Sequence, residues 1–298
     1  MQTVIKLDNV TKMYGKSLGI SDISLEVEKG AVFGFLGPNG AGKSTTINML
    51  VDLIRPTNGR ISVFGLDSKK DSLEIRRRVG FLSGDMALDN RFTGLQQLTY
   101  FANLRGGVPK NRITELASVL ELNLSRRIKT LSRGNRQKVG LISALMHDPE
   151  LLILDEPTSG LDPLIQAQFN KIILDHKKRG KTTFVSSHVL SEIQEICDRV
   201  AFVREGKIID VRHMKEIIAG SPKKVHVSSA DAKLLSLLKQ LKGANVVNAG
   251  KSSIDLTFSG DINQVIKLLA NHKVADVFIE EADLETVFMG YYGVKNAK

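Results

Sequence analysis

The stretch Gly37-Pro38-Asn39-Gly40-Ala41-Gly42-Lys43-Ser44-Thr45 contains the pattern G-x-x-x-x-G-K-[ST] and decides the fold. Residues 31–36 before it form an apolar run of strand length, and residues 46–53 after it have the pattern of an amphipathic helix. A glycine loop between a strand and a helix is the setting in which this pattern binds phosphate. We therefore predict a phosphate-binding loop at this point of the chain.

The residue types of the loop are suited to binding the phosphates of a nucleotide and the Mg²⁺ ion that accompanies them. Glycines let the backbone turn tightly and point its N–H groups inward, so that they and the helix N-terminus hold the α- and β-phosphates. Lys43 can reach the β- and γ-phosphates, and Ser44 can place its hydroxyl on Mg²⁺. The residues predicted to bind nucleotide here are Gly37, Pro38, Asn39, Gly40, Ala41, Gly42, Lys43, Ser44 and Thr45.

Acidic residues follow a second apolar run, residues 151–154. Such a run suits a buried parallel strand, whose carboxyl end is where ligands bind in open α/β sheets. Asp155 is therefore predicted to hold Mg²⁺ through water, and Glu156 to act as general base on the attacking water, a role worth about 10²–10⁴-fold in rate. The next predicted buried strand, residues 182–187, ends on the same edge at His188, which we expect to contact the γ-phosphate.

Between these regions the pattern changes from strands to helices. Helical patterns cover residues 95–104, 113–122 and 136–146, so we predict a helical subdomain inserted at about residues 85–148. Ser132 is the expected N-cap of the third helix. The helix N-terminus behind it is a second anion-binding feature. Asp162 is the expected N-cap of a helix that starts at Pro163 and runs to about Lys178.

Two domains are expected, a nucleotide-binding domain over residues 1–220 and an accessory domain over residues 223–298. Alternating apolar residues between positions 3 and 36 predict antiparallel strands, and residues 200–211 predict a hairpin. After Ser221-Pro222 a strand, helix, strand, strand, helix, strand pattern begins. The predicted fold class is α/β: a P-loop NTPase (RecA-like) core with N-terminal antiparallel strands, an inserted helical subdomain and a small C-terminal α+β domain.

Composition and charge limit the protein's class. The 298 residues include one cysteine, Cys197, which excludes an internal disulfide framework and is expected to be a buried helix residue. No stretch resembles a signal peptide or approaches the ~20 apolar residues of a membrane span, so we expect a cytoplasmic protein. The net charge of +10 permits attraction to anionic lipid or nucleic acid. The basic clusters at residues 76–78 and 177–179 lack interleaved aromatics and are interpreted as solvated faces, and the six histidines show no metal-ligand spacing.

With these residues assembled, the chain resembles the ATP-binding subunits of ABC transporters over its whole length. The motifs that carry the resemblance are the adenine-stacking aromatic Tyr14, the Walker A match Gly37 to Thr45, the signature Leu131 to Asn135, the Walker B match Leu151 to Glu156, the D-loop Ser159 to Asp162 and the switch histidine His188. The resemblance implies an ATPase that uses ATP and Mg²⁺. It also implies a head-to-tail dimer in which Ser132 and Gly134 contact the partner's γ-phosphate.

The resemblance further implies partners and a location. The expected partners are integral membrane permease subunits and a second ATPase subunit, either another copy of this chain or a paralogue, and no nucleic acid is expected. The protein is then peripheral on the inner face of the cell membrane. The C-terminal stretch from Asp283 to Phe288 looks like the tail of ABC-2 type exporter subunits, which argues for export.

Two departures from the family pattern stand out. The signature usually reads L-S-G-G-Q, and here Arg133 and Asn135 take two of its positions while Ser132 and Gly134 remain. The Q-loop glutamine expected after residues 81–83 is replaced by Gly84, whose missing side chain cannot coordinate Mg²⁺. Asp85 is the nearest residue that can supply the oxygen ligand.

A soluble ABC ATPase with a regulatory or nucleic-acid-related role is the alternative. Chromosome-type members insert long coiled coils between the Walker motifs, and this chain has no heptads there. Translation-type members carry two ATPase cassettes, and this chain has one. A catalytically dead nucleotide sensor is disfavoured because Lys43, Asp155, Glu156 and His188 are all present.

Overall fold

The computed structural model describes residues 2–84 and 86–281. The chain divides into two compact units, Met1–Met214 and Lys215–Lys298. The first contains the predicted phosphate loop, and each unit has a hydrophobic core of its own. Asp85 and the stretch from Asp283 to Phe288 lie outside the described residues, so the predictions made for them stay predictions. Among the described helices none is long and apolar enough to cross a membrane.

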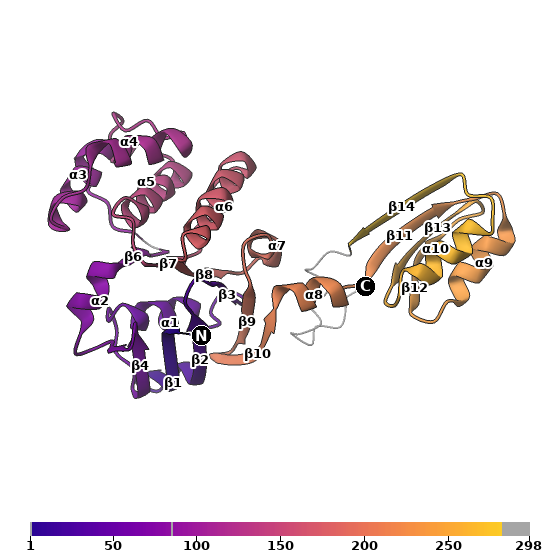
Figure 1. Cartoon of the computed structure of the whole chain (residues 1–298), viewed down its shortest axis with the longest axis horizontal. Coiled ribbons are helices and arrows are strands. Elements are labelled where there is room, and N and C mark those ends of the chain that lie inside the picture. The colour runs from indigo at the N-terminus through magenta and orange to yellow at the C-terminus, as the bar shows by residue number, and fades with distance from the viewer. Residues whose placement is uncertain (1, 85, 282–298) are drawn as a thin grey trace. The chain divides into compact units, whose positions relative to one another are not determined.

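The central sheet of the first unit runs in the order β10-β9-β3-β8-β7-β6 (Figure 1). Its bounds are β3 Val32–Leu36, β6 Val79–Leu82, β7 Leu151–Asp155, β8 Thr182–Ser187, β9 Arg199–Arg204 and β10 Lys207–His213. Strands β9, β3, β8, β7 and β6 are parallel to one another, whereas β10 is antiparallel to β9 and forms the predicted hairpin with it. Every residue of β3, β7 and β8 is buried, which explains the apolar runs of β3 and β7.

A second, antiparallel sheet in the order β2-β1-β4-β5 confirms the prediction for the N-terminal segment. Its strands are β1 Thr3–Tyr14, β2 Ser17–Glu28, β4 Asn58–Val63 and β5 Leu66–Asp67. The helix α1, Lys43–Leu50, contacts β2 and β4 of this sheet and β7 of the central sheet. Ile47, Met49 and Leu50 thereby join the core shared by the two sheets.

The helical region between β6 and β7 contains α3 Gly94–Leu104, α4 Lys110–Val119, the short helix η1 Ile128–Thr130 and α5 Arg133–Leu145. Figure 1 shows α3, α4 and α5 gathered together, and α5 packs against β6 as well as against α3 and α4. Helix α6, Pro163–Lys178, packs on β8. Helix α5 therefore joins the helical region to the edge of the central sheet.

Several local predictions were wrong. The helix after the loop begins at Lys43 rather than residue 46, because the backbone N–H and Oγ1 of Thr46 already donate to Gly42 O. The short helices α2 Ser72–Arg78, α7 Leu190–Gln194 and α8 Met214–Gly220 were not predicted, since none of them spans the three turns that make a helical period visible. Cys197 is buried as expected, but it lies in the turn after α7 rather than in a helix.

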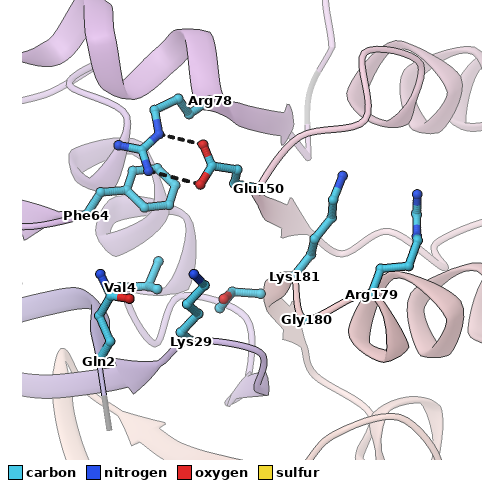
Figure 2. A pocket seen from close by; sticks show the side chains of 10 residues that line it. Gln2, Val4, Lys29, Phe64, Arg78, Glu150, Arg179, Gly180 and Lys181 are labelled. Atoms are coloured by element: carbon cyan, nitrogen blue, oxygen red, sulfur yellow. Dashed lines mark hydrogen bonds and ion pairs between the residues drawn. The ribbon is translucent and has the colours of Figure 1, made fainter.

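The two basic clusters are not simply solvated faces. Arg78 makes a two-bonded ion pair with Glu150, with Nε–Oε1 at 2.7 Å and Nη2–Oε2 at 3.0 Å. Its guanidinium also lies 3.8 Å from the ring centroid of Phe64 (Figure 2). Hydrogen bonding from Arg78 lowers the pKa of the Glu150 carboxyl. In the other cluster Lys177 pairs with Asp198. These contacts link the amino ends of the parallel strands, at the edge opposite the carboxyl ends of β3, β7 and β8.

The second unit has a β-α-β-β-α-β order with a four-stranded antiparallel sheet, β12-β13-β11-β14. Its elements are β11 Lys223–Ser228, α9 Ala232–Gln240, β12 Ala244–Ala249, β13 Ser253–Phe258, α10 Asn263–Ala270 and β14 Asp276–Glu281. This strand order is that of a ferredoxin-like sheet. Leu234, Leu238 and Val265 of the two helices pack on the apolar face of β11 and β13.

Candidate active site

The loop between β3 and α1 has the backbone of a phosphate cradle. Gly40 and Gly42 have φ values of +80° and +100°, a region that favours glycine. A Cβ atom at Gly37 would lie 2.4 Å from Val203 O, so only glycine fits there as well. Lys43 is buried and its Nζ donates to the carbonyl oxygens of Gly37, at 2.7 Å, and Pro38, at 3.2 Å. These two hydrogen bonds hold the Lys43 ammonium against the backbone of the loop.

Asp155 is the last residue of β7 and Glu156 follows it, at the carboxyl edge of the sheet as predicted. Asp155 is 3% exposed, and its Oδ1 accepts a hydrogen bond of 2.6 Å from Ser186 Oγ. The same Ser186 Oγ accepts from the backbone N–H of Glu156 at 3.0 Å. Because Asp155 and Ser186 are partners in the parallel register of β7 and β8, the sheet itself fixes this contact.

The side chain of Glu156 is held between two groups. Its Oε1 lies 3.2 Å from Lys43 Nζ, and its Oε2 lies 2.7 Å from Nδ1 of His188. Oε1 is buried and has no hydrogen-bond partner among the described residues, so the ion pair with Lys43 leaves a hydrogen-bonding position open. The carboxylate therefore has one buried oxygen without a hydrogen-bond partner in the described part of the chain and is held in place by a histidine and a lysine. Such an environment suits a group that accepts a proton from water.

Asp155, Glu156 and His188 line one cavity of about 410 Å³. Its described lining residues are Asn39, Ser44, Asn48, Ser83, Gly84, Arg133, Gln137, Asp155, Glu156, Ser159 and His188. The hydroxyl of Ser44 and the carboxylate of Asp155 are hard oxygen donors of the kind Mg²⁺ prefers. A Cβ at Gly84 would lie 3.2 Å from Asp155 Oδ2, which places the Q-loop position directly against this carboxylate. The donor set therefore fits a magnesium ion.

The signature segment lies against the D-loop of the same chain. Ser132 caps α5, as predicted: its Oγ accepts from Asn135 N at 3.3 Å. A Cβ at Gly134 would lie only 2.2 Å from Gly160 O. Arg133, where the family pattern has glycine, donates from Nη2 to Ser159 Oγ at 3.0 Å and extends into the cavity. The segment thus accommodates the arginine by directing it along the D-loop.

Other predicted site residues do not line this cavity within the described chain. Tyr14 ends β1 and is 49% exposed, with Lys12 Nζ lying 5.3 Å from its ring centroid. It packs near Gly19, whose carbonyl oxygen is adjacent to Gly42 of the loop. Asp162 is the N-cap of α6, and its Oδ1 accepts from Ile165 N at 3.0 Å. Ser132, Gly134 and Asp162 are absent from the described lining.

Two residues with contacts at the acids were not singled out from the sequence. Ser186 bridges Asp155 and the Glu156 backbone, and a polar residue at the end of a buried strand was the available signal. Gln137 donates to the backbone carbonyls after Asp155. Nothing in the local pattern of α5 indicates that contact, because it depends on how α5 packs.

Comparisons with known proteins agree with this geometry. A family model described as "ABC transporter" matches residues 20–159. The chain is 40% identical over 222 residues to the uncharacterized ABC transporter ATP-binding protein YhcH of Bacillus subtilis, covering 72% of each chain. It is 40% identical over 213 residues to the bacitracin transport ATP-binding protein BcrA of Bacillus licheniformis, covering 70% of each. A solved ATP binding subunit of an ABC transporter superposes with a TM-score of 0.67 at 26% identity, covering 73% of this chain and 92% of that one.

Proposed function

Since the chain belongs to the ABC transporter family and is an ATP-binding subunit that hydrolyses ATP, we propose that Glu156 is the general base of this hydrolysis. The observation that carries the proposal is the placement of its carboxylate between Lys43 and His188, with one buried oxygen that has no hydrogen-bond partner among the described residues. In the proposed reaction Glu156 accepts a proton from the water that attacks the γ-phosphorus.

The other residues of the site bind and orient ATP. The N–H groups of the loop and the α1 N-terminus hold the phosphates, and the ammonium of Lys43 balances their charge. His188 orients Glu156 and contacts the γ-phosphate. Ser44 and Asp155 would hold Mg²⁺, with Asp85 as a further proposed ligand. When bound, Mg²⁺ supplies positive charge to the phosphate oxygens. Tyr14 is proposed to stack on the adenine.

As an ABC transporter subunit the protein dimerises and works with membrane permease subunits. We propose that the dimer is head-to-tail, so that Ser132 and Gly134 bind the γ-phosphate held by the partner's loop. The support is that these residues open an α5 N-terminus, while the described cavity of their own chain does not include them. Asp162 would then fix the D-loop beside the interface.

A groove beside α2 and α3 is the proposed docking surface for the permease. Leu73 and Leu104, on the two helices, are 62% and 68% exposed, and Arg76, Arg77 and Arg105 border the same groove. An acidic, partly apolar cytoplasmic segment of a membrane subunit has the complementary chemistry. Helix α2 leads into β6, which ends beside Gly84 in the ATP cavity, so this strand can connect the two sites.

We infer from this proposed docking that the protein is peripheral on the inner face of the cell membrane. Export is the proposed direction, on the basis of the stretch from Asp283 to Phe288.

Glu156→Gln tests the proposal for the general base. The amide keeps the shape of the carboxylate and loses its basicity, so ATP binding is expected to persist while turnover falls by about 10²-fold or more. Equilibrium binding of ATP and steady-state phosphate release measure the two quantities. Wild-type turnover in this variant removes Glu156 from the role.

A further inference from the structure

The backbone of Glu156 is held in an unfavourable conformation. Its φ is +49°, in the left-handed region, where a residue with a Cβ is destabilised by about 1–3 kcal/mol. Such a conformation persists only when surrounding contacts hold it in place. The direction of the Glu156 side chain therefore depends on whatever fixes its backbone.

Hydrogen bonds hold this residue from both sides. Its N–H donates to Ser186 Oγ at 3.0 Å. Its carbonyl oxygen accepts from Gln137 Nε2 at 3.0 Å, and the next carbonyl, that of Pro157, accepts from the same Nε2 at 3.1 Å. The backbone N–H of Ser159 also donates to the Glu156 carbonyl oxygen, at 3.2 Å. Because Pro157 has no N–H, the residue directly after Glu156 offers no backbone donor, and the Gln137 amide adds hydrogen bonds to the two successive carbonyls of the turn.

The amide of Gln137 has no donor to spare for substrate. An –NH₂ group has two N–H bonds, and both are directed to the carbonyls of Glu156 and Pro157. Its remaining polar atom is an oxygen, which accepts hydrogen bonds and does not attract phosphate. Although Gln137 borders the ATP cavity, its chemistry there is that of a support for the backbone.

We propose that Gln137 is a positioning residue for hydrolysis, which acts by fixing the left-handed turn that aims the Glu156 carboxylate. The proposal rests on the proposed role of Glu156 as general base. Gln137 lies in α5, whose first turn is held to the D-loop by Arg133 and by the close approach of Gly134 to Gly160. Through Gln137, the backbone of the proposed general base is thus fixed to α5, the helix that begins at the signature of the same chain.

Gln137→Met and Gln137→Glu test the proposal in the full-length protein. Methionine has a similar length and no donor, and ionised glutamate repels the two carbonyls. Since a displacement of about 1 Å at a reacting group can cost 10²-fold, kcat is expected to fall about 10–100-fold in both variants while the KM for ATP stays within about 2-fold. Gln240→Glu is the matched control, because Gln240 Nε2 donates to Ser236 Oγ in α9 of the other unit.

One further measurement separates positioning from a general structural role. In a double-mutant cycle, Gln137→Met is expected to cause no further loss in the Glu156→Gln background.

The outcomes are distinct. A kcat within 2-fold of wild type in Gln137→Met overturns the proposal. An equal proportional loss of kcat with and without the Glu156 carboxylate shows an effect that is not transmitted through Glu156 and also overturns it. Wild-type turnover of Glu156→Gln alone instead refutes the general-base proposal on which this inference rests.

Discussion

Gly84 stands where a family member would have the Q-loop glutamine, and its surroundings show what a side chain there would meet. A Cβ at this position would lie 3.2 Å from Asp155 Oδ2, a contact that requires the carboxylate to shift by a few tenths of an ångström. The small side chain of Asp155 is held at Oδ1 by Ser186, which leaves Oδ2 as the oxygen that must adjust. The position is therefore next to Asp155, a proposed magnesium ligand, even without a side chain.

We expect Gly84→Gln to be tolerated or partly to replace the missing ligand. Asp85→Ala is expected to weaken Mg²⁺-dependent hydrolysis and its coupling to the membrane subunit, because the proposal makes this carboxylate a ligand of the ion. Titration of ATPase activity with Mg²⁺, with and without the permease, measures both variants. If the Asp85→Ala curve superimposes on that of wild type in both conditions, Asp85 does not replace the Q-loop glutamine as a magnesium ligand.

His176 links stability to pH. It is 1% exposed on the last turn of α6, with Nε2 at 3.0 Å from Pro149 O and Nδ1 at 3.3 Å from Thr183 Oγ1. Burial, reinforced by nearby Lys181 and Arg179, lowers its pKa to about 4 from an ordinary 6.5. Since the folded state binds fewer protons, this stabilisation is complete well above pH 6.5 and is lost as the pH falls towards 4.

Between pH 7.5 and 5.5 this single group should reduce the free energy of unfolding by about 1.3 kcal/mol. Urea denaturation at the two pH values, for wild type and for His176→Gln, measures the difference. The variant should show the smaller pH dependence, with the remainder including His147, whose burial also lowers its pKa to about 4. Equal pH dependence in both proteins would contradict the assignment.

At the scale of elements, α5 is the helix through which several parts of the site are connected. Its N-terminal residues lie on the D-loop, Gln137 in its second turn holds the chain after β7, and its body packs on β6. Any displacement of the α5 N-terminus therefore moves both the signature and the support of Glu156.

Gly134→Ala is expected to displace this N-terminus, because the new methyl would lie 2.2 Å from Gly160 O and backbone cannot yield as a flexible side chain does. ATPase activity should fall while ATP binding to the isolated subunit is nearly unchanged. Asp162→Ala serves as the comparison: it removes the N-cap of α6, at a cost of about 1 kcal/mol, without a steric clash. Thermal melts and steady-state kinetics are compared, and unaltered turnover in Gly134→Ala would exclude a tight signature contact.

At the scale of the whole molecule, the proposed head-to-tail dimer requires residues of two chains to complete each ATP site. Lys43 and Ser132 belong to opposite halves of one composite site if the signature acts on the partner's ATP. A chain with Lys43→Ala keeps an intact signature, and a chain with Ser132→Arg keeps an intact phosphate loop. Mixing the two inactive chains should restore one competent site in each heterodimer.

The measurement is ATPase activity of the mixture against that of each mutant alone, with heterodimers verified by two affinity tags. Activity no higher than the separate mutants, despite verified heterodimers, argues against action in trans. Unmixed wild type at the same total concentration gives the upper limit for recovery.

Much of this architecture was predictable from local patterns. The glycine loop needs left-handed backbone at Gly40 and Gly42, and the strands leading to Lys43 and Asp155 are buried on both faces, so composition alone marks them. The caps at Ser132 and Asp162 follow from single residues before helical patterns and are confirmed. The predicted element pattern of the second unit is matched by its elements from β11 to β14.

Only the tertiary structure shows which side chains meet. His188 reaches Glu156 because β7 and β8 are adjacent and parallel, and Gln137 reaches the same residue because α5 packs beside β6. Arg78 reads as a surface charge in the sequence, yet it pairs with Glu150 across the amino edge of the sheet. Local propensity and periodicity report on neighbours along the chain, whereas these contacts join residues far apart in sequence and depend on strand order and helix packing.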